Sequence, residues 1–266
     1  MVNLIDTYSV LAKIKKEKPL IHHLTNWVTI YDCANVTRTI GALPVMAHAP
    51  EEVAQMAGIA SALVLNIGTL TKDFVDSMII AGKVANKKGI PIILDAVGAG
   101  ATDFRTVECK CLLRELKIGI IKGNAGEVST LAGVEAEVRG VESVKAGDPV
   151  TVAESLAKTS GSVVVITGKT DVVSDSKRTY KIHNGHEMMG KVVGTGCMAA
   201  SVIASFAAVE KDYAKAAAAA LSCYGIAGEI AAASPTVKGP GTFKEAFFDA
   251  LYNLSKKDIE SKARIE

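Results

Sequence analysis

ALVLNIG, residues 62–68, is a continuously apolar run that ends in an asparagine, an isoleucine and a glycine. Three further runs share this character: PIILD (91–95), IGIIKG (118–123) and SVVVITG (162–168). A strand with one solvent-exposed face alternates apolar and polar residues, whereas a strand covered on both faces is apolar throughout. The four runs therefore predict a central sheet that is buried on both faces.

Short β-rich runs alternate with longer helical patterns along most of the chain. We expect strands near 20–24, 43–46, 62–67, 91–95, 118–122 and 162–167, and helices near 29–40, 50–58, 72–88, 106–116, 124–132 and 150–160. Such alternation indicates βαβ units and a mostly parallel sheet. After these elements we expect an edge hairpin at 170–175 and 178–183, then helices at 197–208, 212–234 and 241–257. The pattern predicts a single α/β domain spanning residues 1–266.

The composition points to a small-molecule partner. The 266 residues are 49% hydrophobic, and 30 basic residues against 28 acidic ones give a formal charge of +2. This near balance of charge does not predict the basic surface that binds a nucleic acid or an anionic membrane.

The longest uncharged runs, 196–209 and 216–228, fall short of the roughly 18 apolar residues of a membrane span. Residues 1–18 indicate a short amphipathic helix rather than a signal peptide, and five scattered cysteines favour a reducing cytoplasm.

The carboxyl ends of the predicted strands carry polar residues. In an open parallel sheet, ligands bind beyond these ends, where loops from several strands converge. The candidates for one shared rim are Thr25-Asn26, Asn66, Gly68, Asp95, Lys122-Gly123-Asn124 and Thr167-Gly168.

Gly194-Thr195-Gly196-Cys197 leads directly into the apolar helical stretch MAASVIASFAAV. Backbone N–H groups at the start of a helix bind phosphate or a developing negative charge, and the helix dipole reinforces them. The same location favours the thiolate form of Cys197, which makes this residue a candidate base. A cysteine taken alone is more often a small buried apolar residue.

Two nucleotide-binding signatures fail on spacing. Gly168-Lys169-Thr170 resembles the end of a P-loop, but Val163 stands where the first glycine belongs. Gly98-Ala99-Gly100 would need its third fingerprint glycine at Asp103. The chain is therefore predicted to contain neither a Walker motif nor a dinucleotide fingerprint.

Asn124-Ala125-Gly126-Glu127 has two interpretations. The segment follows a strand and opens a helix, so Asn124 and Glu127 can form a capping box. Together with Asp95 on the adjacent rim, Glu127 and the amide can instead hold a magnesium ion through water molecules. Asp95 has its own structural alternative, as a cap for the turn that follows it.

The ordered set of motifs resembles the hydroxyethylthiazole kinase family of the ribokinase-like superfamily. The resemblance covers nearly the whole chain and rests on His23, Thr25-Asn26, residues 32–35, Gly41, residues 44–47, 65–70, 95–102, 122–127 and 194–197. Gly-Thr-Gly-Cys is the sharpest marker, because ribokinase-like sugar and pyrimidine kinases typically have aspartate in place of Cys197. Ala96 and Tyr31 depart from the family pattern, where proline and asparagine are frequent.

The resemblance implies a ribokinase-like three-layer α/β/α fold and ATP-dependent phosphorylation of the primary hydroxyl of 4-methyl-5-(2-hydroxyethyl)thiazole, in thiamine biosynthesis and salvage. It also implies Mg²⁺ and a cytoplasmic homotrimer with pockets at the subunit interfaces. The implied roles are thiazole binding by Asn26, Met46, Gly68 and Gly194; ATP or phosphate binding by Lys122, Thr167, Gly194, Thr195 and Gly196; magnesium binding by Asp95 and Glu127; and catalysis by Cys197.

Three other functions remain open from the sequence. A related kinase would act on a hydroxymethylpyrimidine or a sugar, although Cys197 in place of aspartate argues against both. A non-catalytic protein would bind the nucleotide without transferring a phosphoryl group. A lyase would use ATP as a cosubstrate in acting on a nucleotide.

Overall fold

In the computed structural model, which describes residues 5–134, 137–139, 142–145 and 147–266, eight strands form one sheet in the order β10-β9-β8-β5-β4-β3-β1-β2. The strands are β1 (Leu20–Leu24), β2 (Leu43–Val45), β3 (Ala62–Asn66), β4 (Ile92–Asp95), β5 (Ile120–Asn124), β8 (Val163–Thr167), β9 (Asp171–Ser174) and β10 (Thr179–Ile182). The first six of these pair in parallel. Strand β9 is antiparallel to both of its neighbours, so the expected edge hairpin is confirmed.

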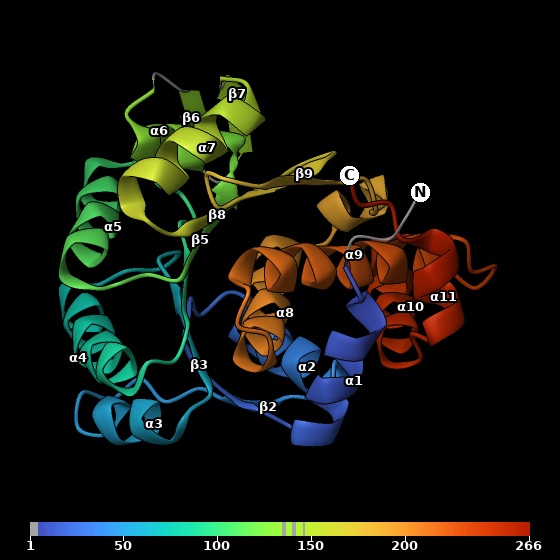
Figure 1. Cartoon of the computed structure of the whole chain (residues 1–266), viewed down its shortest axis with the longest axis horizontal. Coiled ribbons are helices and arrows are strands. Elements are labelled where there is room, and N and C mark those ends of the chain that lie inside the picture. Colours follow the sequence, from blue (N-terminus) through green and yellow to red (C-terminus); the bar gives the residue numbers. More distant parts are fainter. Residues whose placement is uncertain (1–4, 135–136, 140–141, 146) are drawn as a thin grey trace.

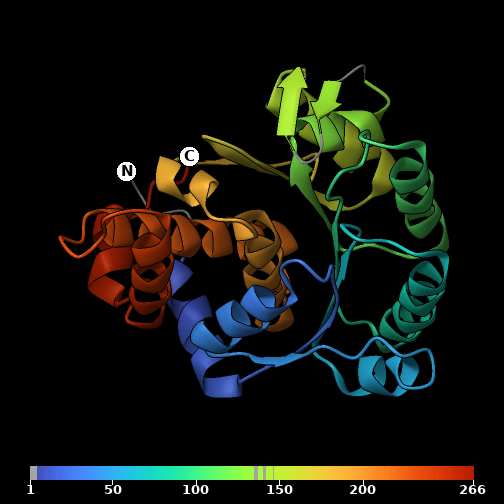
Figure 2. The same cartoon turned by 180° about the vertical axis from the view of Figure 1, so that it is seen from behind.

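Helices cover both faces of this sheet (Figure 1). One layer consists of α3 (Val53–Ile59), α4 (Lys72–Lys88), α5 (Asp103–Glu115), α6 (Ala125–Ala132) and α7 (Pro149–Ser160). The other side carries α1 (Thr7–Glu17), α2 (Ile30–Thr39), α8 (Thr195–Val209) and α9 (Tyr213–Ala232), with α10 (Pro240–Tyr252) and α11 (Lys256–Lys262) farther out, as the reverse view also shows (Figure 2). The three-layer α/β/α architecture is therefore confirmed.

Alternation along the strands divides the core into two. Val64 and Ile93 pack with α8 and α9, whereas Leu63 and Ile92 pack with the helices of the opposite layer. Successive side chains of a strand point to opposite faces, so the even-numbered positions of β3 belong to the α8 side. By the same alternation, Asn66 at the end of β3 and Asp95 at the end of β4 also face α8.

The end of the chain differs from the expectation of one helix over 241–257. Helix α10 ends at Tyr252 and a separate helix, α11, begins at Lys256. Ser255 caps the start of α11, and Asp258 completes a capping box with it. A serine followed three residues later by an acidic residue favours a new helix start over continuation, because both side chains satisfy backbone N–H groups there.

Two further elements lie outside the expected set. A short antiparallel hairpin joins β6 (Glu137–Arg139) and β7 (Glu142–Lys145), between α6 and α7. A 3₁₀ helix, η1 (Glu187–Lys191), precedes the turn that begins α8. In the part of the chain that the structure describes, no helix is long and apolar enough to cross a membrane.

Candidate active site

The ends of three neighbouring strands place Asn66, Asp95 and Lys122 side by side. Asn66 pairs in register with Asp95, and Asp95 with Lys122. The Nζ atom of Lys122 donates to Oδ1 of Asp95 at 2.9 Å, and Nδ2 of Asn66 donates to Oδ2 at 2.8 Å. All three residues are buried. The carboxylate of Asp95 is therefore held between a cation and an amide, on the face of the sheet that α8 covers.

Helix α8 begins at this cluster. Gly194 adopts a left-handed conformation with φ of 91°, and a Cβ atom there would approach Cγ2 of Thr29 to 2.8 Å. Among the residues described, no side chain caps the first turn of α8. A Cβ atom on Gly196 would lie 3.3 Å from Nζ of Lys122. The predicted helix start is confirmed, and it presents its N–H groups beside a buried ammonium group.

The thiol of Cys197 lies inside the cluster. The residue is buried, and Nδ2 of Asn26 donates to its Sγ atom at 3.4 Å. Burial raises the pKa of the Cys197 thiol, the nearby carboxylate of Asp95 raises it further, and Lys122 opposes them. Burial and the Asp95 carboxylate both act against the thiolate that the sequence predicts at this helix N-terminus, so a thiolate at Cys197 stays a prediction. Loss of water and proximity to a carboxylate both disfavour the ionised thiol.

Asn26 and Gly68 approach the cluster from the loops after β1 and β3. Oδ1 of Asn66 accepts from Nδ2 of Asn26 at 2.9 Å and from the N–H of Gly68 at 3.0 Å. A Cβ atom on Gly68 would approach Cβ of Asn26 to 2.8 Å, so glycine permits this close packing. Asn26, Gly68, Gly194, Gly196, Lys122, Asp95 and Cys197 are thus brought together.

Glu127 lies at the start of α6 and forms the capping box with Asn124. Its Oε2 atom accepts from the N–H of Asn124 at 2.7 Å, and Oδ1 of Asn124 accepts from the N–H of Glu127 at 3.0 Å. The other carboxylate oxygen, Oε1, accepts from the N–H of Gly98 at 2.7 Å. The capping interpretation is confirmed. It is incomplete, because Glu127 also holds the turn that follows Asp95.

The remaining predicted residues lie around the cluster. The Thr195 hydroxyl donates back to the carbonyl groups of Met189 and Val192, so this hydroxyl is used within the turn that precedes α8. Thr167 is half-buried at the end of β8 and donates to the carbonyl of Gly123 at 3.4 Å. Met46 follows the edge strand β2 and is half-buried; no hydrogen bond found among the described residues joins it to the cluster.

Sequence reasoning missed two contributors. It placed Asn66 on the rim without a role, because nothing in its strand-end position reveals that both ends of its amide are used. It gave no role to Arg105, whose Nη2 atom donates to the carbonyl of Gly68 at 2.6 Å. A Cβ atom on Gly98 would lie 2.1 Å from Nη1 of Arg105. Arg105 therefore links the loops after β3 and β4, a contact between segments that only the fold brings together.

Asp95 and Glu127 are the candidate magnesium ligands at the cluster. Burial raises the pKa of both the Asp95 and the Glu127 carboxyl, although Lys122 and hydrogen-bond donors oppose it. Lys122 supplies one positive charge near two buried carboxyl groups, so a further positive charge would be stabilised there. No group of three or more metal-binding side chains occurs within the described residues. The set fits a magnesium ion that keeps water ligands and shares phosphate oxygens, as Mg²⁺ prefers, rather than an all-protein cage.

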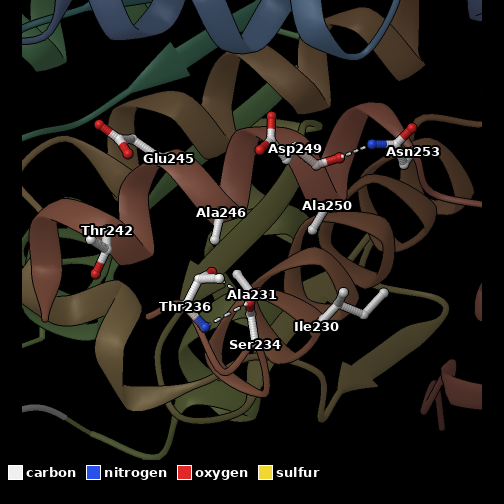
Figure 3. A pocket seen from close by; sticks show the side chains of 10 residues that line it. All are labelled: Ile230, Ala231, Ser234, Thr236, Thr242, Glu245, Ala246, Asp249, Ala250 and Asn253. Atoms are coloured by element: carbon white, nitrogen blue, oxygen red, sulfur yellow. Dashed lines mark hydrogen bonds between the residues drawn. The ribbon is translucent and has the colours of Figure 1, made fainter. Parts of the chain in front are cut away.

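A surface groove lies away from the cluster. It has a volume of about 390 Å³ and opens between α9 and α10 (Figure 3). Small side chains such as Ala231, Ala246 and Ala250 form its floor, and Glu245 and Asp249 lie along α10. None of the predicted site residues lines it, so the groove is distinct from the cluster at the strand ends.

The fold is shared with ribokinase-like proteins of low sequence identity. A ribokinase-like superfamily protein from Enterococcus faecalis matches 91% of the chain and 93% of its own length with a TM-score of 0.62 at 13% identity. The pyridoxal kinase from Staphylococcus aureus in complex with ADP matches 80% of the chain and 88% of its own length, with a TM-score of 0.60 at 12% identity. The chain therefore has the fold of the ribokinase-like kinases.

Much closer relatives define the family. The model described as "Hydroxyethylthiazole kinase family" matches residues 11–257, and this chain belongs to that family. It is 56% identical to the hydroxyethylthiazole kinase of Methanosarcina mazei over 96% of this chain and 98% of the relative. The structure of a hydroxyethylthiazole kinase from Pyrococcus horikoshii covers 98% of both chains, with a TM-score of 0.89 at 39% identity. The protein is an enzyme that phosphorylates the thiazole alcohol in thiamine salvage.

Proposed function

We propose that this protein transfers the γ-phosphoryl group of ATP to the primary hydroxyl of 4-methyl-5-(2-hydroxyethyl)thiazole, with Mg²⁺ as its cofactor. One observation carries the proposal: the Lys122 ammonium lies against Gly196 in the first turn of α8, next to the Cys197 thiol. The N–H groups proposed to bind phosphate and the thiol proposed to contact the alcohol thus belong to the same turn.

Positioning and charge stabilisation supply most of the acceleration in this mechanism. Phosphoryl transfer passes through a loose transition state whose negative charge is spread over the transferring oxygens. Preorganised N–H groups and cations aimed at that charge stabilise it. We assign this role to the backbone of Gly194, Thr195 and Gly196 and to Lys122. Thr167, at the end of β8, is assigned a contact with the ATP phosphates.

The thiazole alcohol is assigned to the side of the cluster formed by Asn26, Met46, Gly68 and Gly194. Cys197 would then accept the hydroxyl proton, or a hydrogen bond from it, late in the transfer. Because burial raises the pKa of this thiol, its protonated form dominates near neutrality. We therefore expect a contribution at or below the lower end of the usual 10²- to 10⁴-fold range of a general base.

Asp95 and Glu127 are proposed to hold Mg²⁺ through water molecules. When bound, the ion would neutralise negative charge on the phosphates. The protein's own part is to orient the two carboxylates: Lys122 and Asn66 hold Asp95, and the N–H groups of Gly98 and Asn124 hold Glu127.

A homotrimer with substrate pockets at its subunit interfaces is part of the proposal. Large apolar side chains are exposed beside the cluster: Trp27 by 59%, Val28 by 69%, Tyr31 by 76% and Val193 by 72%. The close approach of Gly194 to Thr29 brings the two segments that carry them together. Exposed apolar patches of this kind mark interaction sites. Light scattering at several protein concentrations would test the assembly; a monomer mass throughout would contradict it.

The cytoplasm is the proposed location. All five cysteines are unpaired, and Cys33, Cys109, Cys197 and Cys223 are buried. Unpaired thiols in a chain of this length are consistent with a reducing compartment. Fluorescence of a tagged chain in fractionated cells would test this location.

A coupled ADP-release assay tests the reaction itself. The thiazole alcohol is compared with a hydroxymethylpyrimidine, with a sugar and with ATP alone, and mass spectrometry identifies the phosphorylated product. We expect ADP release to depend on the thiazole alcohol. ADP release with the pyrimidine or sugar but not the thiazole would indicate another substrate class. Nucleotide binding without alcohol-dependent release would contradict a kinase.

A further inference from the structure

The single amide of Asn66 connects the two sides of the proposed reaction. Its Nδ2 atom donates to Asp95 at 2.8 Å, on the phosphate side. Its Oδ1 atom accepts from Asn26 at 2.9 Å and from the N–H of Gly68 at 3.0 Å, on the alcohol side. Asn66 is 1% exposed, so water does not replace these partners.

The partners of Asn66 determine how its amide is oriented. A carboxylate only accepts hydrogen bonds when ionised, so the NH₂ group must face Asp95. The two groups on the other side are donors, so the carbonyl must face them. The opposite orientation would place oxygen against oxygen and nitrogen against two donors. In a buried site each unsatisfied polar group destabilises the fold, which holds the amide in one arrangement.

A continuous chain of contacts results. Lys122 bonds to Asp95, Asp95 to Asn66, Asn66 to Asn26, and Asn26 to the thiol of Cys197. Asn66 is the central member of this chain. Any change in the position of Asp95 would alter the hydrogen bond from Nδ2 of Asn66, and the same planar amide carries the acceptor used by Asn26.

We propose that Asn66 is a positioning residue that couples nucleotide binding to alcohol binding. The role rests on the proposed function, because it requires the alcohol at Asn26 and Gly68 and the phosphates at Lys122. Asn66 touches neither ligand in this role. It acts by fixing Asp95 and Asn26 relative to one another, so that each ligand binds more tightly when the other is present.

Calorimetry on the full chain tests the coupling. The dissociation constant of the thiazole alcohol is measured with and without a non-hydrolysable ATP analogue and Mg²⁺. We expect the analogue to tighten alcohol binding in the wild type by at least about fivefold, the lower end of typical coupling between sites. In Asn66→Ala we expect the two constants to agree within twofold, with alcohol binding still measurable.

A matched control separates coupling from simple loss of stability. The amide of Asn86 also bridges two segments, donating to the carbonyl of Lys117 and accepting from its N–H, both at 2.8 Å, away from the cluster. Asn86→Ala should keep the wild-type coupling. If Asn66→Ala does not fold, Asn66→Ser replaces it, because a hydroxyl keeps some hydrogen bonding but is too short to span both sides.

The results distinguish this inference from the proposed function. Wild-type coupling that persists in the Asn66 variant overturns the role of Asn66 and leaves the kinase intact. A wild type in which the analogue leaves alcohol affinity unchanged also overturns it. A wild type that neither binds nor phosphorylates the thiazole alcohol contradicts the proposed function, and the inference falls with it.

Discussion

The ammonium group of Lys122 and the carboxylate of Asp95 form a buried ion pair across adjacent strands, with an Nζ to Oδ1 distance of 2.9 Å and side-chain exposures of 4% and 0%. The register of β4 and β5 creates the pair, because it sets the two residues directly opposite one another. Asn66 satisfies the second carboxylate oxygen. The pair places charge at the start of α8, where phosphate binding is proposed.

Removing one partner of this pair should be costly. Lys122→Met leaves Asp95 as an uncompensated buried charge, and such losses typically destabilise a protein by about 3–5 kcal/mol. Urea unfolding measures the effect. Lys83→Met is the matched control, because the Lys83–Glu115 pair is 60% and 37% exposed and should contribute below about 1 kcal/mol. Equal losses of unfolding free energy in the two variants would show that burial does not determine how much the Lys122–Asp95 pair contributes to stability.

Replacing the candidate base should have a moderate effect on the rate. Cys197→Ala removes the thiol while leaving the N–H groups of the turn, so we expect kcat to fall by more than about twofold but by no more than about 100-fold. Cys223→Ala provides the control, since Cys223 is also buried but lies in α9. A rate of Cys197→Ala within twofold of the wild type would exclude Cys197 as a base and leave the anion site unaffected.

The metal role of Glu127 can be separated from its capping role. Glu127→Gln removes a negative charge but keeps one oxygen acceptor, so we expect the magnesium concentration for half-maximal rate to rise by about 10-fold, in the range seen when supporting ligands are changed. A rate titration with MgCl₂ measures this. Asp148→Asn, at the N-cap of α7, is the control for a cap alone. If the titration of Glu127→Gln is unaltered, Glu127 has no metal role and serves only the helix cap and the turn at Gly98.

Gly98 should be required for more than its backbone conformation. Gly98 and Gly89 both have φ of 76°, but a Cβ atom on Gly98 would collide with Arg105, whereas Gly89 faces open space. Both alanine variants should lose about 1–3 kcal/mol from strain in the left-handed region. Only Gly98→Ala should also raise the KM of the alcohol, because Arg105 holds the carbonyl of Gly68. Identical kinetics in the two variants would contradict a positioning role for Arg105.

The buried imidazole of His23 should make stability depend on pH. Burial lowers the pKa of His23 to about 3, and its Nε2 atom contacts Oγ of Ser201 at 3.1 Å. Between pH 6.5 and about 3 the unfolded chain binds a proton that the folded chain does not, so stability falls as the pH is lowered, by up to about 1.4 kcal/mol per pH unit.

Unfolding of His23→Gln at several pH values tests this contribution. The variant should lose that part of the pH dependence, so the stability of the wild type relative to the variant should fall as the pH is lowered below about 6.5. His186→Gln, at an exposed residue, should follow the wild type. Parallel stability curves for His23→Gln and the wild type over pH 4 to 7 would show that His23 does not cause the dependence.

Local pattern alone was sufficient to predict the sheet and its rim. Runs such as ALVLNIG and SVVVITG are too apolar for strands with a solvent-exposed face, so a sheet covered on both sides follows from their composition. Polar residues at the ends of such runs, including Asp95 and Lys122, then had to gather at one edge. The glycine-rich turn before the alanine-rich stretch likewise predicted the start of α8, which the structure confirms.

The order and register of the strands came only from the tertiary structure, because they depend on contacts between residues far apart in the chain. That register makes Asn66, Asp95 and Lys122 direct neighbours and turns them towards α8. It also buries Cys197 beside a carboxylate, and both effects raise the pKa of the thiol, opposite to the direction that the helix N-terminus alone predicts. A helix dipole can be anticipated from a sequence motif; desolvation cannot, because it depends on what the rest of the chain packs around the group.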